Sequence, residues 1–134
     1  MAGKGIKGGQ VYGKSDENGC VFHDSVESLF GSCTHISIHC FLSEETTHLV
    51  DYEMISLMPH MGDDGMLCGN HIVNCARGGI VDEQALTELT HSGHISASAF
   101  DVFSVEPITA DNPLLSAKNT QLSPHAAAFT AESL

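Results

Sequence analysis

Three side chains of complementary chemistry each follow a segment whose pattern predicts a buried strand: Arg77, Glu106 and His125. A guanidinium can hold a carboxylate through two parallel hydrogen bonds and polarise a neighbouring carbonyl. An imidazole exchanges protons near neutral pH, and an adjacent carboxylate orients the ring and favours its protonated form. Together the three groups could bind a small acid and move a proton at its hydroxyl or oxo oxygen. On spacing alone, two solvated charges and a structural histidine are the commoner arrangement.

Strands and helices alternate along the chain after an irregular, Gly-rich start. The pattern predicts helices at 25–30, 51–58 and 82–92, and strands at 35–40, 71–75, 96–103 and 120–123. Such alternation indicates an α/β fold with a mostly parallel sheet covered on both faces. Ligands of these sheets bind beyond the carboxyl ends of the strands. We therefore expect the three candidate side chains to lie at one edge of the sheet.

The helix at 82–92 has the clearest sequence signals. Asp82 is a suitable N-cap, Leu86 and Leu89 share one face with Ala85, and Gly93 is typical of a helix end. The segment 60–70 reads as a loop that two aspartates keep in solvent.

Composition restricts the function classes. The 134 residues fit one domain, and 42% of them are hydrophobic, which argues against a disordered chain. The formal net charge of −12 argues against binding to nucleic acid or to an anionic membrane surface. We find no apolar run of the ~18–20 residues that a membrane span needs. Five cysteines at irregular spacing, without a signal-peptide pattern, predict reduced thiols and a cytoplasmic location.

Several segments, in order, resemble one enzyme family. They are the NCARGGIVDE segment at 74–83, AFDVFSVEP at 99–107, NPLL at 112–115 and LSPHA at 122–126, preceded by a similar stretch at 28–49. The chain resembles the D-isomer-specific 2-hydroxyacid dehydrogenases, of the phosphoglycerate dehydrogenase type, over about residues 20–134. The resemblance implies an NAD-dependent oxidoreductase acting on the CH–OH group of a D-2-hydroxy acid. Residues 25–134 would form the C-terminal part of its Rossmann-type NAD-binding domain, with 1–24 an irregular segment.

The resemblance also implies a role for each matching position. Arg77 would bind the carboxylate of a small 2-hydroxy or 2-oxo acid, His125 would be the general acid and base, and Glu106 would pair with His125. Hydride would move between the substrate C2 and the nicotinamide ring. The residues expected to contact NAD are His39, Cys40, Cys75, Ala76, Arg77, Asp101, His125 and Ala127. The alanine run at 126–128 is expected to begin a helix.

The chain departs from the family pattern in three places. Gly3–Gly8 spells G-x-G-x-x-G, but no strand precedes it and no helix pattern follows, so an irregular Gly-rich segment is favoured over a phosphate-binding turn. The loop at 60–70 is longer than the family's short turn, and it could displace Arg77 or bulge outward. The chain also ends about one turn into the family's next helix.

These departures predict a domain truncated at its N-terminal side, without a substrate domain. We therefore expect weak or no activity from this chain. The alternative is a non-catalytic NAD(H)-responsive binding module of the corepressor type. Sheet edges exposed by the missing strands would favour association, so a homodimer is possible.

A metal site is not expected, although histidines and cysteines are frequent. His35 and His39 share a face of their predicted strand, whereas Cys40 points to the other face. Zinc needs four converging ligands, which this arrangement does not supply. Cys75 is interpreted as a small residue beside a cofactor rather than a nucleophile.

Overall fold

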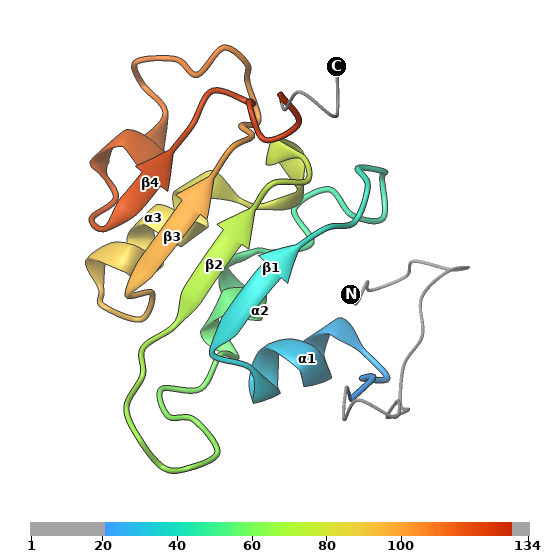
Figure 1. Cartoon of the computed structure of the whole chain (residues 1–134), viewed down its shortest axis with the longest axis vertical. Helices are drawn as coiled ribbons and strands as arrows, with labels where there is room; N and C mark the ends of the chain where they lie inside the picture. Colours follow the sequence, from blue (N-terminus) through green and yellow to red (C-terminus); the bar gives the residue numbers. More distant parts are fainter. Residues whose placement is uncertain (1–20, 130–134) are drawn as a thin grey trace.

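The computed structural model describes residues 21–129, so the Gly3–Gly8 motif lies outside the described residues (Figure 1). The described chain contains α1 (Val26–Ser32), β1 (His35–Ile38), α2 (Tyr52–Ser56), β2 (His71–Asn74), α3 (Glu83–His91), β3 (Ala97–Phe100) and β4 (Thr120–Leu122). Two short 3-10 helices, η1 (Gly78–Ile80) and η2 (Pro113–Ser116), lie in the connections. Each helix and strand expected from the sequence is present. All four strands, and α2, end earlier than the patterns predicted.

The four strands form one parallel sheet in the order β1-β2-β3-β4. Ile36 of β1 lies beside Ile72 of β2, which lies beside Ser98 of β3. The parallel α/β architecture predicted from the sequence is therefore confirmed. Because all four strands run the same way, their carboxyl ends meet at a single edge of the sheet.

Helices α2 and α3 cover one face of this sheet (Figure 1). Side chains on the covered face, such as Ile72 and Phe100, are buried. On the opposite face Ser37 is exposed, and Val73 of the central strand β2 is 37% exposed. The expectation that both faces are covered is wrong for the described residues. Parallel crossovers are right-handed, and strands added in one direction place every crossover helix on the same face.

Local sequence signals explain where the helices begin. The side chains of Ser25, Asp51 and Asp82 accept hydrogen bonds from backbone N–H groups in the first turns of α1, α2 and α3. Gly93, which follows the C-cap residue Ser92 of α3, adopts a φ of +86°, a conformation that favours glycine because other residues are strained there. Leu86 is fully buried, so the apolar face predicted for α3 packs into the core.

The loop at 60–70 bulges away from the site. Met61 and Leu67 form an isolated antiparallel bridge, and the residues between them are largely exposed. The loop precedes β2, whereas Arg77 follows β2, so the two lie at opposite ends of that strand (Figure 1). Of the two outcomes considered for this loop, the outward bulge is observed.

The alanine run at 126–128 does not begin a helix within the described residues. It forms a turn closed by a hydrogen bond from the Phe129 N–H to the Ala126 carbonyl. The N–H groups of Ala126 and Ala127 instead donate to the carboxylate of Asp101, which directly follows β3. Across residues 21–129, no helix has the length and apolar character required to span a bilayer.

Candidate active site

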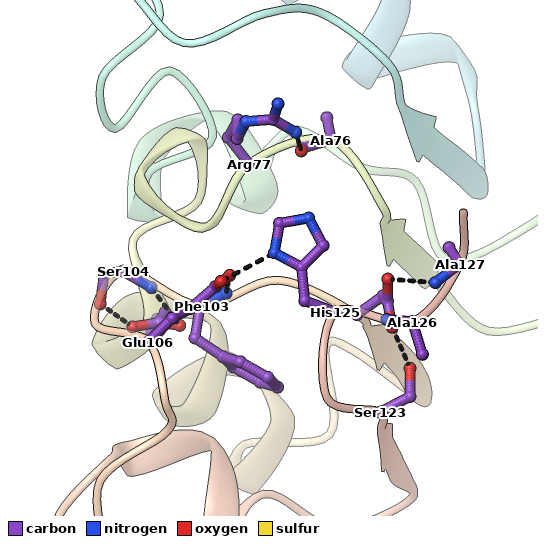
Figure 2. Close-up of polar contacts among 11 residues, drawn as sticks. Ala76, Arg77, Phe103, Ser104, Glu106, Ser123, His125, Ala126 and Ala127 are labelled. Atoms are coloured by element: carbon purple, nitrogen blue, oxygen red, sulfur yellow. Dashed lines mark hydrogen bonds and ion pairs between the residues drawn. The ribbon is translucent and has the colours of Figure 1, made fainter. Parts of the chain in front are cut away.

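Glu106 and His125 meet beyond the carboxyl ends of β3 and β4. The Nδ1 atom of His125 lies 2.7 Å from the Oε2 atom of Glu106, and both side chains are partly exposed (Figure 2). Arg77 follows β2, and Figure 2 shows it on the neighbouring turn. The structure thus brings the glutamate and histidine into contact and places the arginine beside them.

Two hydrogen bonds fix the Glu106 carboxylate. Its Oε1 atom accepts a hydrogen bond from the Phe103 N–H at 3.0 Å, while Oε2 faces His125. The contact with His125 is the main cause that lowers the pKa of Glu106, followed by the Phe103 N–H; the positive charge of Arg77 contributes less. Glu106 is therefore a carboxylate at neutral pH, oriented toward the imidazole.

The backbone around His125 is held by a carboxylate beneath it. His125 has a φ of +57°, and the next two N–H groups converge on Asp101, which is 5% exposed. Asp101 Oδ1 accepts hydrogen bonds from Ser123 Oγ at 2.6 Å and Ala126 N at 2.8 Å, and Oδ2 accepts one from Ala127 N at 2.9 Å. Burial tends to raise the pKa of Asp101, but these hydrogen bonds together lower it.

This arrangement bears on two residues that were expected to contact the cofactor. Both carboxylate oxygens of Asp101 bind the 123–127 segment, and the Ala127 N–H is used by Asp101. Asp101 therefore supports the 123–127 segment that carries His125; Figure 2 labels Ser123, Ala126 and Ala127 around it. The sequence motif contained Ser123, but its spacing gave no indication that the hydroxyl binds Asp101.

A buried asparagine shapes the turn that carries Arg77. Asn74 is fully buried at the end of β2; its Oδ1 accepts a hydrogen bond from Ala76 N at 3.0 Å, and its Nδ2 donates to the Arg77 carbonyl at 2.9 Å. The Arg77 guanidinium is exposed and donates to the Ala76 carbonyl. A polar residue at the end of an apolar strand was the available signal for this role.

Five of the residues expected to contact the cofactor line one cavity. This cavity, of about 480 Å³, lies at the carboxyl ends of β1 and β2 and is lined by His39, Cys40, Phe41, Leu42, Cys75, Ala76 and Arg77. Phe41 and Leu42 expose apolar surface beside the guanidinium. A wall that is partly apolar and partly cationic, at the carboxyl edge of a parallel sheet, lies where ligands of such folds bind. Burial raises the pKa of the Cys40 thiol, so Cys40 forms a neutral part of the wall.

A second cavity adjoins the Glu106–His125 pair. It measures about 430 Å³ and is lined by these two residues together with Phe103, Pro107, Ile108 and Pro124. Asp101 and Ala127 line neither cavity.

The histidines of the sheet do not form a metal centre in the described part of the chain. There, no group of three or more histidine, cysteine, aspartate or glutamate side chains is arranged to hold an ion. His35 and His71 instead stack with ring centroids 4.3 Å apart.

Comparison with known proteins identifies the domain. The model of the D-isomer specific 2-hydroxyacid dehydrogenase NAD binding domain matches residues 7–127. The chain is 42% identical to hydroxypyruvate reductase of Thermotoga maritima over 80% of its length, and 40% identical to D-3-phosphoglycerate dehydrogenase of Methanocaldococcus jannaschii over 81%. These matches span 33% and 19% of the respective relatives.

A solved structure shows the same fold. A 2-hydroxyacid dehydrogenase from Rhizobium etli, in complex with NADP, HEPES and L(+)-tartaric acid, superposes with a TM-score of 0.72 and 26% identity. The match covers 84% of this chain and 35% of that one. The chain therefore belongs to the D-isomer specific 2-hydroxyacid dehydrogenase family, of whose NAD-binding domain it carries a large part.

Proposed function

We propose that this chain contributes to an NAD-dependent oxidoreductase that interconverts a D-2-hydroxy acid and its 2-oxo acid. The observation that carries the proposal is the 2.7 Å contact between Glu106 and His125, at the sheet edge that also presents Arg77. A carboxylate-oriented imidazole next to an exposed guanidinium is a combination suited to a small hydroxy acid.

Each of the three residues has a distinct task in this proposal. Arg77 binds the substrate carboxylate through its two-pronged guanidinium. His125 is held at Nδ1 by Glu106, which leaves Nε2 to accept the hydroxyl proton during oxidation and to return it during reduction. The ionised Glu106 stabilises the imidazolium that forms. A bound nicotinamide dinucleotide supplies the acceptor or donor of the hydride at C2.

The cofactor would lie along the cavity lined by His39, Cys40, Cys75, Ala76 and Arg77. We propose NAD as the cofactor, with NADP as the competitor to test because the Rhizobium etli relative was solved with NADP. We propose a substrate of the 3-phosphoglycerate type, with hydroxypyruvate and glyoxylate as further candidates.

The relatives extend well beyond the matched region, so we propose that the chain alone turns over slowly. Turnover of roughly one per second or more by the purified chain would contradict this part of the proposal. A second copy of the chain could complete the site, which measurement of the oligomeric state with and without cofactor would reveal.

Titration with NADH, followed by cofactor fluorescence, tests the proposal directly because the chain contains no tryptophan. We expect saturable binding in the micromolar to millimolar range. Arg77→Ala should weaken binding, whereas Lys118→Ala, which removes the same charge from an exposed residue beside β4, should not. Absence of binding up to millimolar NADH would refute the proposal. Binding without turnover of any 2-hydroxy acid would favour the NAD(H)-responsive binding module.

A further inference from the structure

Glu83 is a buried carboxylate that binds the backbone segment leading to Glu106. It is the first residue of α3 and is 7% exposed. Its Oε2 atom accepts a hydrogen bond from Ser104 N at 3.3 Å, and its Oε1 atom accepts hydrogen bonds from Ser104 Oγ and from Asn112 Nδ2. All three partners donate, so this environment suits a side chain that has two acceptor oxygens, as a carboxylate does.

The peptide that Glu83 binds is packed against the turn carrying Arg77. A Cβ atom added to Gly78 would lie 1.8 Å from the carbonyl carbon of Phe103 and 2.3 Å from the nitrogen of Ser104. Only a glycine allows this approach of two backbones. The 103–104 peptide is thus clamped between Gly78 and the carboxylate of Glu83.

The same short segment also determines where Glu106 points. The Phe103 N–H donates to Glu106 Oε1, and Glu106 Oε2 contacts His125. A continuous series of contacts therefore runs from the buried Glu83, through the 103–104 backbone, to the imidazole. Displacing this backbone would move the donor that fixes the Glu106 carboxylate.

We propose that Glu83 is a positioning residue for the Glu106–His125 pair, which it reaches through the Phe103–Ser104 backbone. The proposal rests on the function proposed above for that pair. Replacing the carboxylate with an amide leaves a single oxygen to accept hydrogen bonds, and its NH₂ group then faces donors. The 103–104 backbone loses part of its anchorage, and the alignment of Glu106 with His125 loosens.

The experiment reads the protonated nitrogen of the His125 ring in the purified, ¹⁵N-labelled chain without cofactor or substrate. Long-range ¹H–¹⁵N correlation at about pH 8 distinguishes the Nδ1–H from the Nε2–H tautomer. The His125 signals are assigned by their loss in His125→Asn. Glu106→Gln supplies the spectrum of the ring without its carboxylate partner, and we expect the wild type to be protonated at Nδ1.

Glu83→Gln should move the tautomer ratio toward that of Glu106→Gln, by roughly a third of the difference or more. Glu88→Gln is the matched control, since it removes the same charge from an exposed position of α3 and should leave the ratio unchanged. If Glu83→Gln does not fold, Ser104→Ala removes one of the three donors and should shift the ratio less, in the same direction.

A wild-type ratio in every folded variant that alters the Glu83 contacts would reduce Glu83 to a purely structural residue and overturn the proposal. A wild-type ring protonated only at Nε2 would overturn it too. Because no ligand is present, failure of NADH binding would not affect this measurement. Conversely, NADH binding with unaltered tautomers would refute only the role of Glu83.

Discussion

Replacing Asp101 with asparagine should destabilise the fold by removing the support beneath His125. Asp101 accepts three hydrogen bonds at 2.6–2.9 Å while only 5% exposed. Asparagine can retain the bonds from Ser123 and Ala126 through its one oxygen, but its NH₂ group then faces the Ala127 N–H. A hydrogen bond to a charged group contributes about 1.5–3 kcal/mol. Losing one of these bonds, together with the charge, should lower the free energy of unfolding by about 2–3 kcal/mol at pH 7.

The effect of this substitution depends on pH in a defined direction. The folded-state pKa of Asp101 is lowered, so its carboxylate contributes stability that is complete above the unfolded-state pKa of about 3.9. That contribution decreases as the pH falls through the folded-state pKa. The difference in unfolding free energy between wild type and Asp101→Asn should therefore stay constant from pH 7 to about 5 and shrink below about 4.

Urea unfolding followed by far-ultraviolet circular dichroism measures this difference. Asp63→Asn is the control, because Asp63 is exposed and its loss should change stability by less than about 0.5 kcal/mol. Two results would refute the reasoning. One is an unfolding free energy of Asp101→Asn equal to that of the control. The other is a difference that persists undiminished at a pH where the wild-type carboxyl is protonated.

Two further predictions concern the turn after β2. Gly78→Ala should destabilise the protein by about 3 kcal/mol or prevent folding, because the added Cβ would lie 1.8 Å from the Phe103 backbone. Gly31→Ala is the control: its added Cβ would have nothing within 4 Å, so it should be neutral or stabilising in the same thermal unfolding series. Arg77→Lys should weaken binding of a 2-oxo acid to the NADH-loaded chain by roughly tenfold or more, because an ammonium lacks the two-pronged geometry of a guanidinium. Isothermal titration calorimetry measures this affinity, and equal affinities of the two proteins would argue against Arg77 as the residue that binds the substrate carboxylate.

Much of the fold is local and could be predicted from the sequence. Alternating Ile36 and Ile38 predicted β1, and Asp82 and Gly93 marked the two ends of α3. These signals act within a few residues, where spacing alone determines which face is apolar and which side chain caps a helix. The carboxyl-end rule for parallel strands then correctly placed Glu106 and His125 at one edge.

The supports of the site could not be predicted in the same way. Asp101 reaches residues 22–26 positions later, and Glu83 reaches residues 21 and 29 positions later. No periodicity encodes such contacts, because they depend on the register between strands and on how closely two turns approach. The open face of the sheet was missed for a related reason. It follows from the direction in which strands are added, which alternation of helices and strands does not specify.

Burial separates the groups that support the site from those that would meet a ligand. Asn74, Glu83 and Asp101 are buried, and each binds backbone donors or acceptors, whereas Arg77 and His125 present exposed side chains. Satisfied buried polar groups hold a backbone rigidly, because leaving any of their bonds unmade is costly. Substitutions at the supports should therefore change stability and ligand affinity together. Substitutions at Arg77 or His125 should change affinity at nearly constant stability, so measuring both quantities across one variant series separates the two classes of residue.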